Sequence, residues 1–96
     1  MDLKLITNDN GVLEAQCDAP EWSQGDDLIC FLKEHFGATI IDKAEGPDAR
    51  MWKLRIAAEH LIVHQLDTGD ISFFVEGKND GELVASIAES IRLGLK

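Results

Sequence analysis

The segment Met51–Ala57 constrains the fold more than any other part of the chain, because its apolar and polar residues alternate strictly. Successive side chains of a strand point to opposite faces of a sheet. The residues that share one face are Trp52, Leu54 and Ile56. The residues that share the other face are Met51, Lys53 and Arg55. The alternation is typical of an antiparallel strand with one buried face and one face in water, and it predicts a sheet covered on one side only.

Five further segments have the composition of strands, being short, rich in apolar or β-branched residues and bounded by turn residues. They are Leu3–Thr7, Val12–Cys17, Ala38–Ile41, His60–Leu66 and Ile71–Val75. Asn10-Gly11 supplies the positive φ angles of a tight hairpin between the first two. Asp67–Asp70 has the composition of a turn between the last two. The sequence thus predicts six short strands.

The first of two predicted helices lies between the hairpin and the third strand. Ser23 is placed to cap it, Asp26 and Asp27 lie near the positive end of its dipole, and Gly37 is the expected stop. Its apolar residues recur at helical spacing and are Leu28, Ile29, Leu32 and Phe36. We therefore predict an amphipathic helix that packs on the sheet.

The second predicted helix closes the chain. Asn79 or Asp80 caps it, and Asn79 with Glu82 has the spacing of a capping box. Its apolar stripe consists of Val84, Ile87, Ala88, Ile91 and Leu95. The order β-β-α-β-β-β-β-α within one domain, residues 1–96, predicts an α+β two-layer sandwich: a mainly antiparallel sheet of five to six strands with two helices on one face.

The charge of the chain bounds the partners it can take. Eighteen acidic against nine basic side chains give a formal net charge of −9, and residues 1–49 hold eleven of the acids but three of the bases. Gripping phosphates requires local basic charge, so direct nucleic-acid binding and docking on an anionic membrane are disfavoured. We expect the acidity either to keep the chain soluble or to steer a basic protein partner.

Targeting signals and cysteines point to the cytoplasm. The longest apolar run, Leu28–Leu32, is far shorter than the ~20 residues that cross a bilayer, and the chain does not open with the basic and apolar regions of a secretory signal. Cys17 and Cys30 form no Cys-x-x-Cys pair, so two reduced thiols are expected. Both are expected to be buried and inert, Cys30 because it lies in the apolar part of the first helix.

The histidines are the first candidates for chemistry. On a helix, His60 and His64 could share a zinc ion, whereas on a strand they lie about 13 Å apart and cannot. The β-branched pair Ile62-Val63 between them favours the strand, which predicts two surface or edge histidines. His35, near the end of the first helix, is expected to be structural. The carboxylates lie in turns and first helical turns, so we predict no catalytic, cofactor-binding or metal-binding residue and no enzyme.

The face of the sheet that lies in water is the more informative candidate for a functional surface. It carries Lys53 and Arg55, and because strand residues alternate, either Phe73 or Phe74 must join them there. An amphipathic patch of this kind recruits a partner or a second copy of the chain, unless a loop or the N-terminal hairpin covers it. The candidate interaction residues, with two acids of the first helix, are Asp26, Asp27, Lys53, Arg55 and Phe74.

The second half of the chain, with Met51–Ile56, Leu61–His64 and Ile71–Glu76 followed by a closing helix, resembles small bacterial domain families of unknown function. The resemblance implies a bacterial cytosolic protein and assigns no functional residue. We expect a small acidic, non-enzymatic protein-interaction or regulatory module that needs no cofactor, with homodimerisation open. The alternatives are an immunity-type inhibitor or nucleic-acid mimic that binds a basic partner, and a small ligand- or metal-binding protein.

Overall fold

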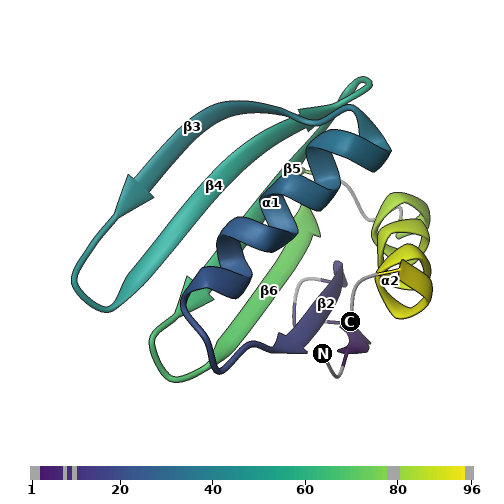
Figure 1. Cartoon of the computed structure of the whole chain (residues 1–96). Coiled ribbons are helices and arrows are strands. Elements are labelled where there is room, and N and C mark those ends of the chain that lie inside the picture. The colour runs from purple at the N-terminus through teal and green to yellow at the C-terminus, as the bar shows by residue number, and fades with distance from the viewer. Residues whose placement is uncertain (1–2, 8, 10, 78–80, 95–96) are drawn as a thin grey trace.

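A computed structural model describes residues 3–7, 9, 11–77 and 81–94, and confirms the predicted α+β architecture and element order (Figure 1). The strands are β1 Leu3–Thr7, β2 Leu13–Asp18, β3 Thr39–Glu45, β4 Ala49–Ile56, β5 Glu59–Leu66 and β6 Asp70–Val75. The helices are α1 Ser23–Phe36 and α2 Glu82–Gly94.

The six strands form one antiparallel sheet in the order β1-β2-β6-β5-β4-β3. Strands β3 to β6 follow one another as hairpins, and the N-terminal hairpin β1–β2 joins the sheet through the pairing of β2 with β6. The two edges of the sheet are therefore β1 and β3.

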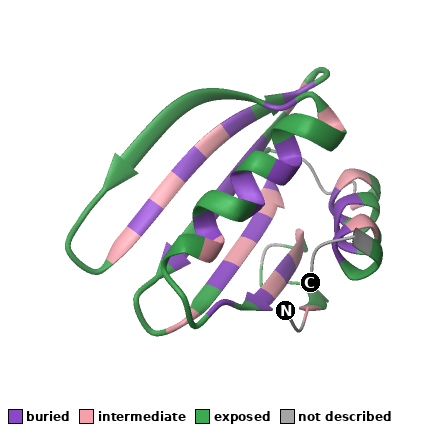
Figure 2. Cartoon of the chain, viewed as in Figure 1, coloured by how far each residue is buried: buried purple, intermediate pink, exposed green. Residues whose placement is uncertain are grey.

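One hydrophobic core lies between the sheet and the two helices. Figure 1 shows α1 lying over the sheet, roughly along the strands, and α2 lying next to β2, and Figure 2 shows buried positions alternating along the strands. The inward strand residues include Trp52, Leu54, Ile56, Leu61, Val63, Ile71, Phe73 and Val75. They pack with Leu28 and Leu32 of α1 and with Val84, Ile87 and Ile91 of α2 in a single cluster. Both helices thus cover the same face, as the alternation in 51–57 predicts.

The N-terminal end of α1 differs from the prediction, whereas its C-terminal end agrees with it. The helix includes Ser23, and Trp22 occupies the N-cap position without a side-chain cap, so the predicted Ser23 cap is wrong. Instead, Gln24 Oε1 accepts a hydrogen bond from the Glu21 N–H at 2.9 Å. Gly37 ends the helix in the left-handed conformation (φ 66°), where its N–H donates to the Leu32 carbonyl.

Strand β3 is longer than predicted. Composition indicates a strand over Ala38–Ile41, whereas pairing with β4 extends it to Glu45, with an irregular register between Ile40 and Asp42. All seven of its residues are exposed, because neither helix reaches this edge. The predicted Asn10 of the first hairpin, the caps at Asn79 or Asp80, and Leu95 lie outside the described residues.

Candidate interaction face

The face of the sheet opposite the helices, which we call the open face, is not covered by either helix, since both pack in the core on the other side. It lies behind the sheet as drawn in Figure 1. The N-terminal hairpin does not fold over it, because β1 and β2 extend the sheet beside β6. Its residues are Lys4, Ile6, Glu14, Gln16, Asp18, Thr39, Asp42, Ala44, Ala49, Met51, Lys53, Arg55, His60, Ile62, His64, Leu66, Asp70, Ser72 and Phe74.

A central row of side chains crosses the open face at right angles to the strands. The registers pair Glu14 with Phe74, Phe74 with Ile62, Ile62 with Lys53 and Lys53 with Asp42. The middle of the row is apolar: Ile62 is only 9% exposed and Phe74 is half-buried, although no helix covers them. An acidic side chain flanks this apolar centre on β2 and a basic one on β4. The row thus has an apolar centre with a charged side chain on either side.

An ion pair fixes the basic side of the row. Lys53 Nζ lies 3.0 Å from Glu76 Oε1, and because Glu76 follows β6, the lysine reaches across β5 to meet it. A half-exposed pair contributes at most about 1 kcal/mol to stability, so its main effect is to orient the lysine stem over the face. Arg55 is exposed beside His60 and Thr39 and forms no ion pair with the described residues.

A shallow apolar hollow of about 300 Å³ adjoins the open face where the β3–β4 hairpin turns. Ala44, Ala49, Met51, His64 and Leu66 contribute to its lining. Leu66 remains 46% exposed, which is high for a leucine on an interior strand. The hollow extends the exposed apolar surface from the central row toward one end of the sheet.

The five predicted interaction residues fall on two separate surfaces. Lys53, Arg55 and Phe74 lie together on the open face, and the outward phenylalanine is Phe74 rather than Phe73. Asp26 and Asp27 are exposed on α1, in the layer that covers the opposite face. Asp26 is engaged from below by Arg50, whose Nη1 lies 3.2 Å from its carboxylate. The acids of α1 and the open face therefore cannot contact one flat partner surface together.

A buried polar cluster, which the sequence did not predict, surrounds Arg50, and the arginine is 5% exposed. Its Nε donates to Gln65 Oε1 at 3.1 Å, its Nη2 donates to the Trp22 carbonyl at 2.6 Å, and Gln65 Nε2 donates to the same carbonyl at 3.0 Å. The guanidinium carbon lies 4.4 Å from the centroid of the Trp22 ring and 4.8 Å from that of Trp52. The available signal was positional, because Arg50 and Gln65 are polar residues at inward positions of their strands.

The Arg50 cluster holds the start of α1 against the sheet rather than offering a ligand site. The guanidinium has partners on all three nitrogens, and no buried side-chain nitrogen or oxygen of the described residues lacks a hydrogen bond. Gly25 allows this close approach of α1 to the cluster, because a Cβ at position 25 would overlap Gln65 Oε1 and come within 2.8 Å of Arg50 Nη2. An arginine with every donor occupied has none to spare for an anion.

The two cysteines differ. Cys30 is exposed, with its Sγ 3.8 Å from Glu34 Oε1, so the prediction that it is buried is wrong. The run 28–32 is apolar throughout, but an α-helix turns by about 100° per residue, and position 30 falls on the outer side. Cys17 is 2% exposed, as predicted, and burial raises the pKa of its thiol to about 11.

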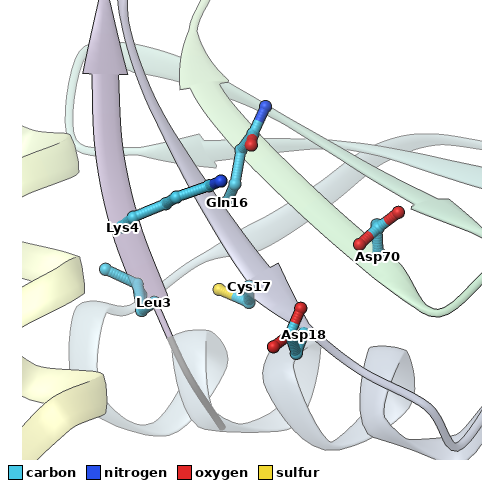
Figure 3. A pocket seen from close by; sticks show the side chains of 6 residues that line it. All are labelled: Leu3, Lys4, Gln16, Cys17, Asp18 and Asp70. Carbon is cyan, nitrogen blue, oxygen red and sulfur yellow. The ribbon is translucent and has the colours of Figure 1, made fainter.

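Cys17 borders a hollow of about 200 Å³ at the β1–β2–β6 end of the sheet (Figure 3). Leu3 and Cys17 point toward the helix side, whereas Lys4 and Gln16 point to the open face. Besides burial, the charge of Asp18 raises the thiol pKa. A thiol kept protonated at neutral pH is not a nucleophile, so the hollow does not activate Cys17.

The histidines lie where the strand prediction places them. His60 and His64 are both exposed on β5, which is an interior strand, so they are surface residues but not edge residues. His35 packs against Phe31, with the ring centroids 4.5 Å apart. Within the described part of the chain, no group of three or more His, Cys, Asp or Glu side chains is placed to hold a metal ion.

Comparison of the chain with protein-family models, with curated proteins and with solved structures found no match. The resemblance of the second half to small bacterial domains therefore stays a prediction. In the described residues, neither helix combines the length and the apolar character needed to cross a membrane.

Proposed function

We propose that this chain is a non-enzymatic protein-interaction module and that it binds its partner through the open face. The observation that carries the proposal is the central row, in which Phe74 and Ile62 form an apolar centre between Glu14 and Lys53. Ile62 and Phe74 pack against each other across β5 and β6, which stabilises the sheet, and the part of this apolar centre that stays exposed offers a docking surface the contact that contributes most to affinity.

The chemistry of the remaining candidates supports a binding role over a catalytic one. The Cys17 thiol is kept in its neutral form by burial, which lowers its reactivity. The buried Arg50 guanidinium donates its hydrogen bonds to Gln65, to Asp26 and to the Trp22 carbonyl. The strongest polar groups of the fold thus stabilise it, while the open face keeps exposed apolar and charged groups.

A second candidate, an inhibitor that occupies the basic cleft of another protein, is supported by the net charge of −9. Exposed acids of α1, among them Asp27 and Glu34, give this reading a surface on the helix side. It predicts that the helix layer, and not the open face, contacts the partner.

A photo-crosslinking experiment separates the two surfaces. A photoreactive residue is placed either at His64, exposed on the open face, or at Lys33, exposed on α1, and each variant is illuminated inside cells that produce the chain. We expect discrete covalent adducts from position 64 and none from position 33. Adducts from position 33 alone would support the inhibitor, and adducts from neither position would contradict the proposed function.

A substitution in the row provides the matched control. Phe74→Ser removes the apolar centre of the open face without touching the core, since Phe73 and not Phe74 packs against the helices. We expect this variant to stay folded, with a thermal unfolding midpoint lowered by roughly 5–10 °C through the loss of the pair with Ile62, while the yield of adducts from position 64 falls. Phe74 variants that fold normally and crosslink as before would contradict the role of the central row.

A further inference from the structure

We infer that the partner that fits the open face is a second copy of this chain, related by a two-fold axis that runs parallel to the strands. This inference rests on the proposed function, because it names the occupant of the same surface. It is carried by the distribution of charge across the open face, which is complementary to itself.

The open face divides into an acidic half and a basic half. The half formed by β1, β2 and β6 carries the carboxylates of Glu14, Asp18, Asp70 and, just after β6, Glu76, against the single amine of Lys4. The half formed by β5, β4 and β3 carries Lys53 and Arg55 against Asp42. The boundary between the halves runs between Phe74 on β6 and Ile62 on β5, which is also the apolar centre.

Only one of the two simple face-to-face arrangements places opposite charges in contact. A two-fold axis across the strands would set the acidic half against itself, with its four carboxylates facing four more. An axis parallel to the strands, placed between β5 and β6, sets each acidic half against the basic half of the other copy. In isologous interfaces every contact occurs twice, so each favourable pair is counted twice.

The strand registers then specify the contacts in the central row. Phe74 of one copy faces Ile62 of the other, and Glu14 of one copy faces Lys53 of the other. Within one chain, Glu14 and Lys53 are separated by three inter-strand steps, or about 14 Å, and cannot touch. Glu76, which holds Lys53 in the single chain, lies beside the row and adds a second carboxylate to that lysine.

The flat area of the open face lies below the accessible surface that a standard interface takes from each partner, which places the dimer at the small end of the interface size range. Six strands span about 24 Å between the axes of the two outer strands, and strands of about six residues are about 20 Å long. The open face therefore has a flat area on the order of 500 Å², to which the relief of the side chains adds accessible surface. Standard interfaces take about 800 Å² of accessible surface per partner. An axis parallel to the strands also keeps the two sheets aligned, which is a common packing of stacked sheets.

The inference can be tested by reversing the charges of Glu14 and Lys53 in two separate variants and then mixing the variants. Lys53→Glu sets Glu14 against a second glutamate, and Glu14→Lys sets Lys53 against a second lysine, so each variant is expected to dissociate at least tenfold more readily than the original chain. A mixture of the two variants restores both opposite-charge contacts, but only in a heterodimer. We expect sedimentation equilibrium to show dimers of the original chain, monomers of each variant alone, and dimers of the mixture.

Lys33→Glu and Glu34→Lys are the matched controls, because they make the same charge changes on the exposed side of α1 and are expected to leave the dimer intact. Recovery in the mixture also shows that both variants fold. An original chain that stays monomeric at its highest soluble concentration, single variants that remain dimeric, or a mixture that stays monomeric would each overturn the inference. If crosslinks from position 64 nevertheless reach a different protein, the docking function stands and only the second copy is wrong.

Discussion

Gly25→Ala should destabilise the fold even though alanine is the better helix former. Gly25 lies in the first turns of α1 and is buried against the Arg50 cluster. In the interior of an exposed helix, replacing glycine by alanine gains about 1 kcal/mol. Here the added Cβ overlaps Gln65 Oε1 and comes 2.7 Å from Gln65 Cδ, so the glutamine side chain or the helix must move.

The expected cost follows from the bonds that Gln65 would lose. Its Oε1 accepts from Arg50 Nε at 3.1 Å and from Arg50 Nη2 at 2.5 Å, and its Nε2 donates to the Trp22 carbonyl at 3.0 Å. A buried hydrogen bond contributes about 1 kcal/mol, one to a charged group about 2 kcal/mol, and a group left unpaired costs more. After the gain in helix propensity is subtracted, Gly25→Ala should lower the free energy of unfolding by about 2–4 kcal/mol.

Urea denaturation followed by tryptophan fluorescence measures this change, and a double-mutant cycle identifies its cause. In a chain that already carries Gln65→Ala, the overlap with Gln65 is gone, and Gly25→Ala should cost at least about 1 kcal/mol less than it does alone. An unfolding free energy that is unchanged or increased by Gly25→Ala would refute the close approach of α1 to Gln65.

Three further predictions concern single positions. Gly37→Ala should lower the unfolding free energy by about 1 kcal/mol through backbone strain alone, because φ is +66° and nothing lies within 4 Å of the added Cβ. In the native protein, Cys30 should react rapidly with a thiol reagent at pH 8 and Cys17 should not, which peptide mapping would check. Burial raises the pKa of the Cys17 thiol from 9.0 to about 11, so the stability that the neutral thiol contributes is present below pH 9 and is lost as the pH rises through 11. Over this range the free energy of unfolding of the original chain should fall by about 3 kcal/mol more than that of Cys17→Ala, which urea denaturation at each pH would measure.

The local sequence pattern was sufficient to place the side chains of a strand where one face of that strand is uniformly apolar. The alternation in β4 placed Trp52, Leu54 and Ile56 in the core and Lys53 and Arg55 outside, as the structure confirms. The same rule applied to β6 left one phenylalanine on the open face. The element order and the two layers could be predicted because the two helices and the inner strands carry their own hydrophobic patterns.

The parts that were missed depend on contacts between distant segments. The end of β3 is polar, and only pairing with β4 makes Asp42 to Glu45 a strand. Arg50 and Gln65 are 15 residues apart and become partners through the β4–β5 register. The charge halves of the open face depend on β2 lying beside β6, a neighbour relation that no local pattern encodes.

Thiol footprinting in cells tests most directly whether the open face is a docking surface. In a Cys30→Ser chain, His64→Cys places an accessible thiol on the open face and Lys33→Cys places one on α1, while Cys17 stays buried. A face that is occupied nine-tenths of the time is labelled about tenfold more slowly than a free one. We expect a maleimide to label position 64 about tenfold more slowly in cells than in dilute purified protein, and position 33 equally fast in both. Equal protection at the two positions, or none at position 64, would contradict the claim.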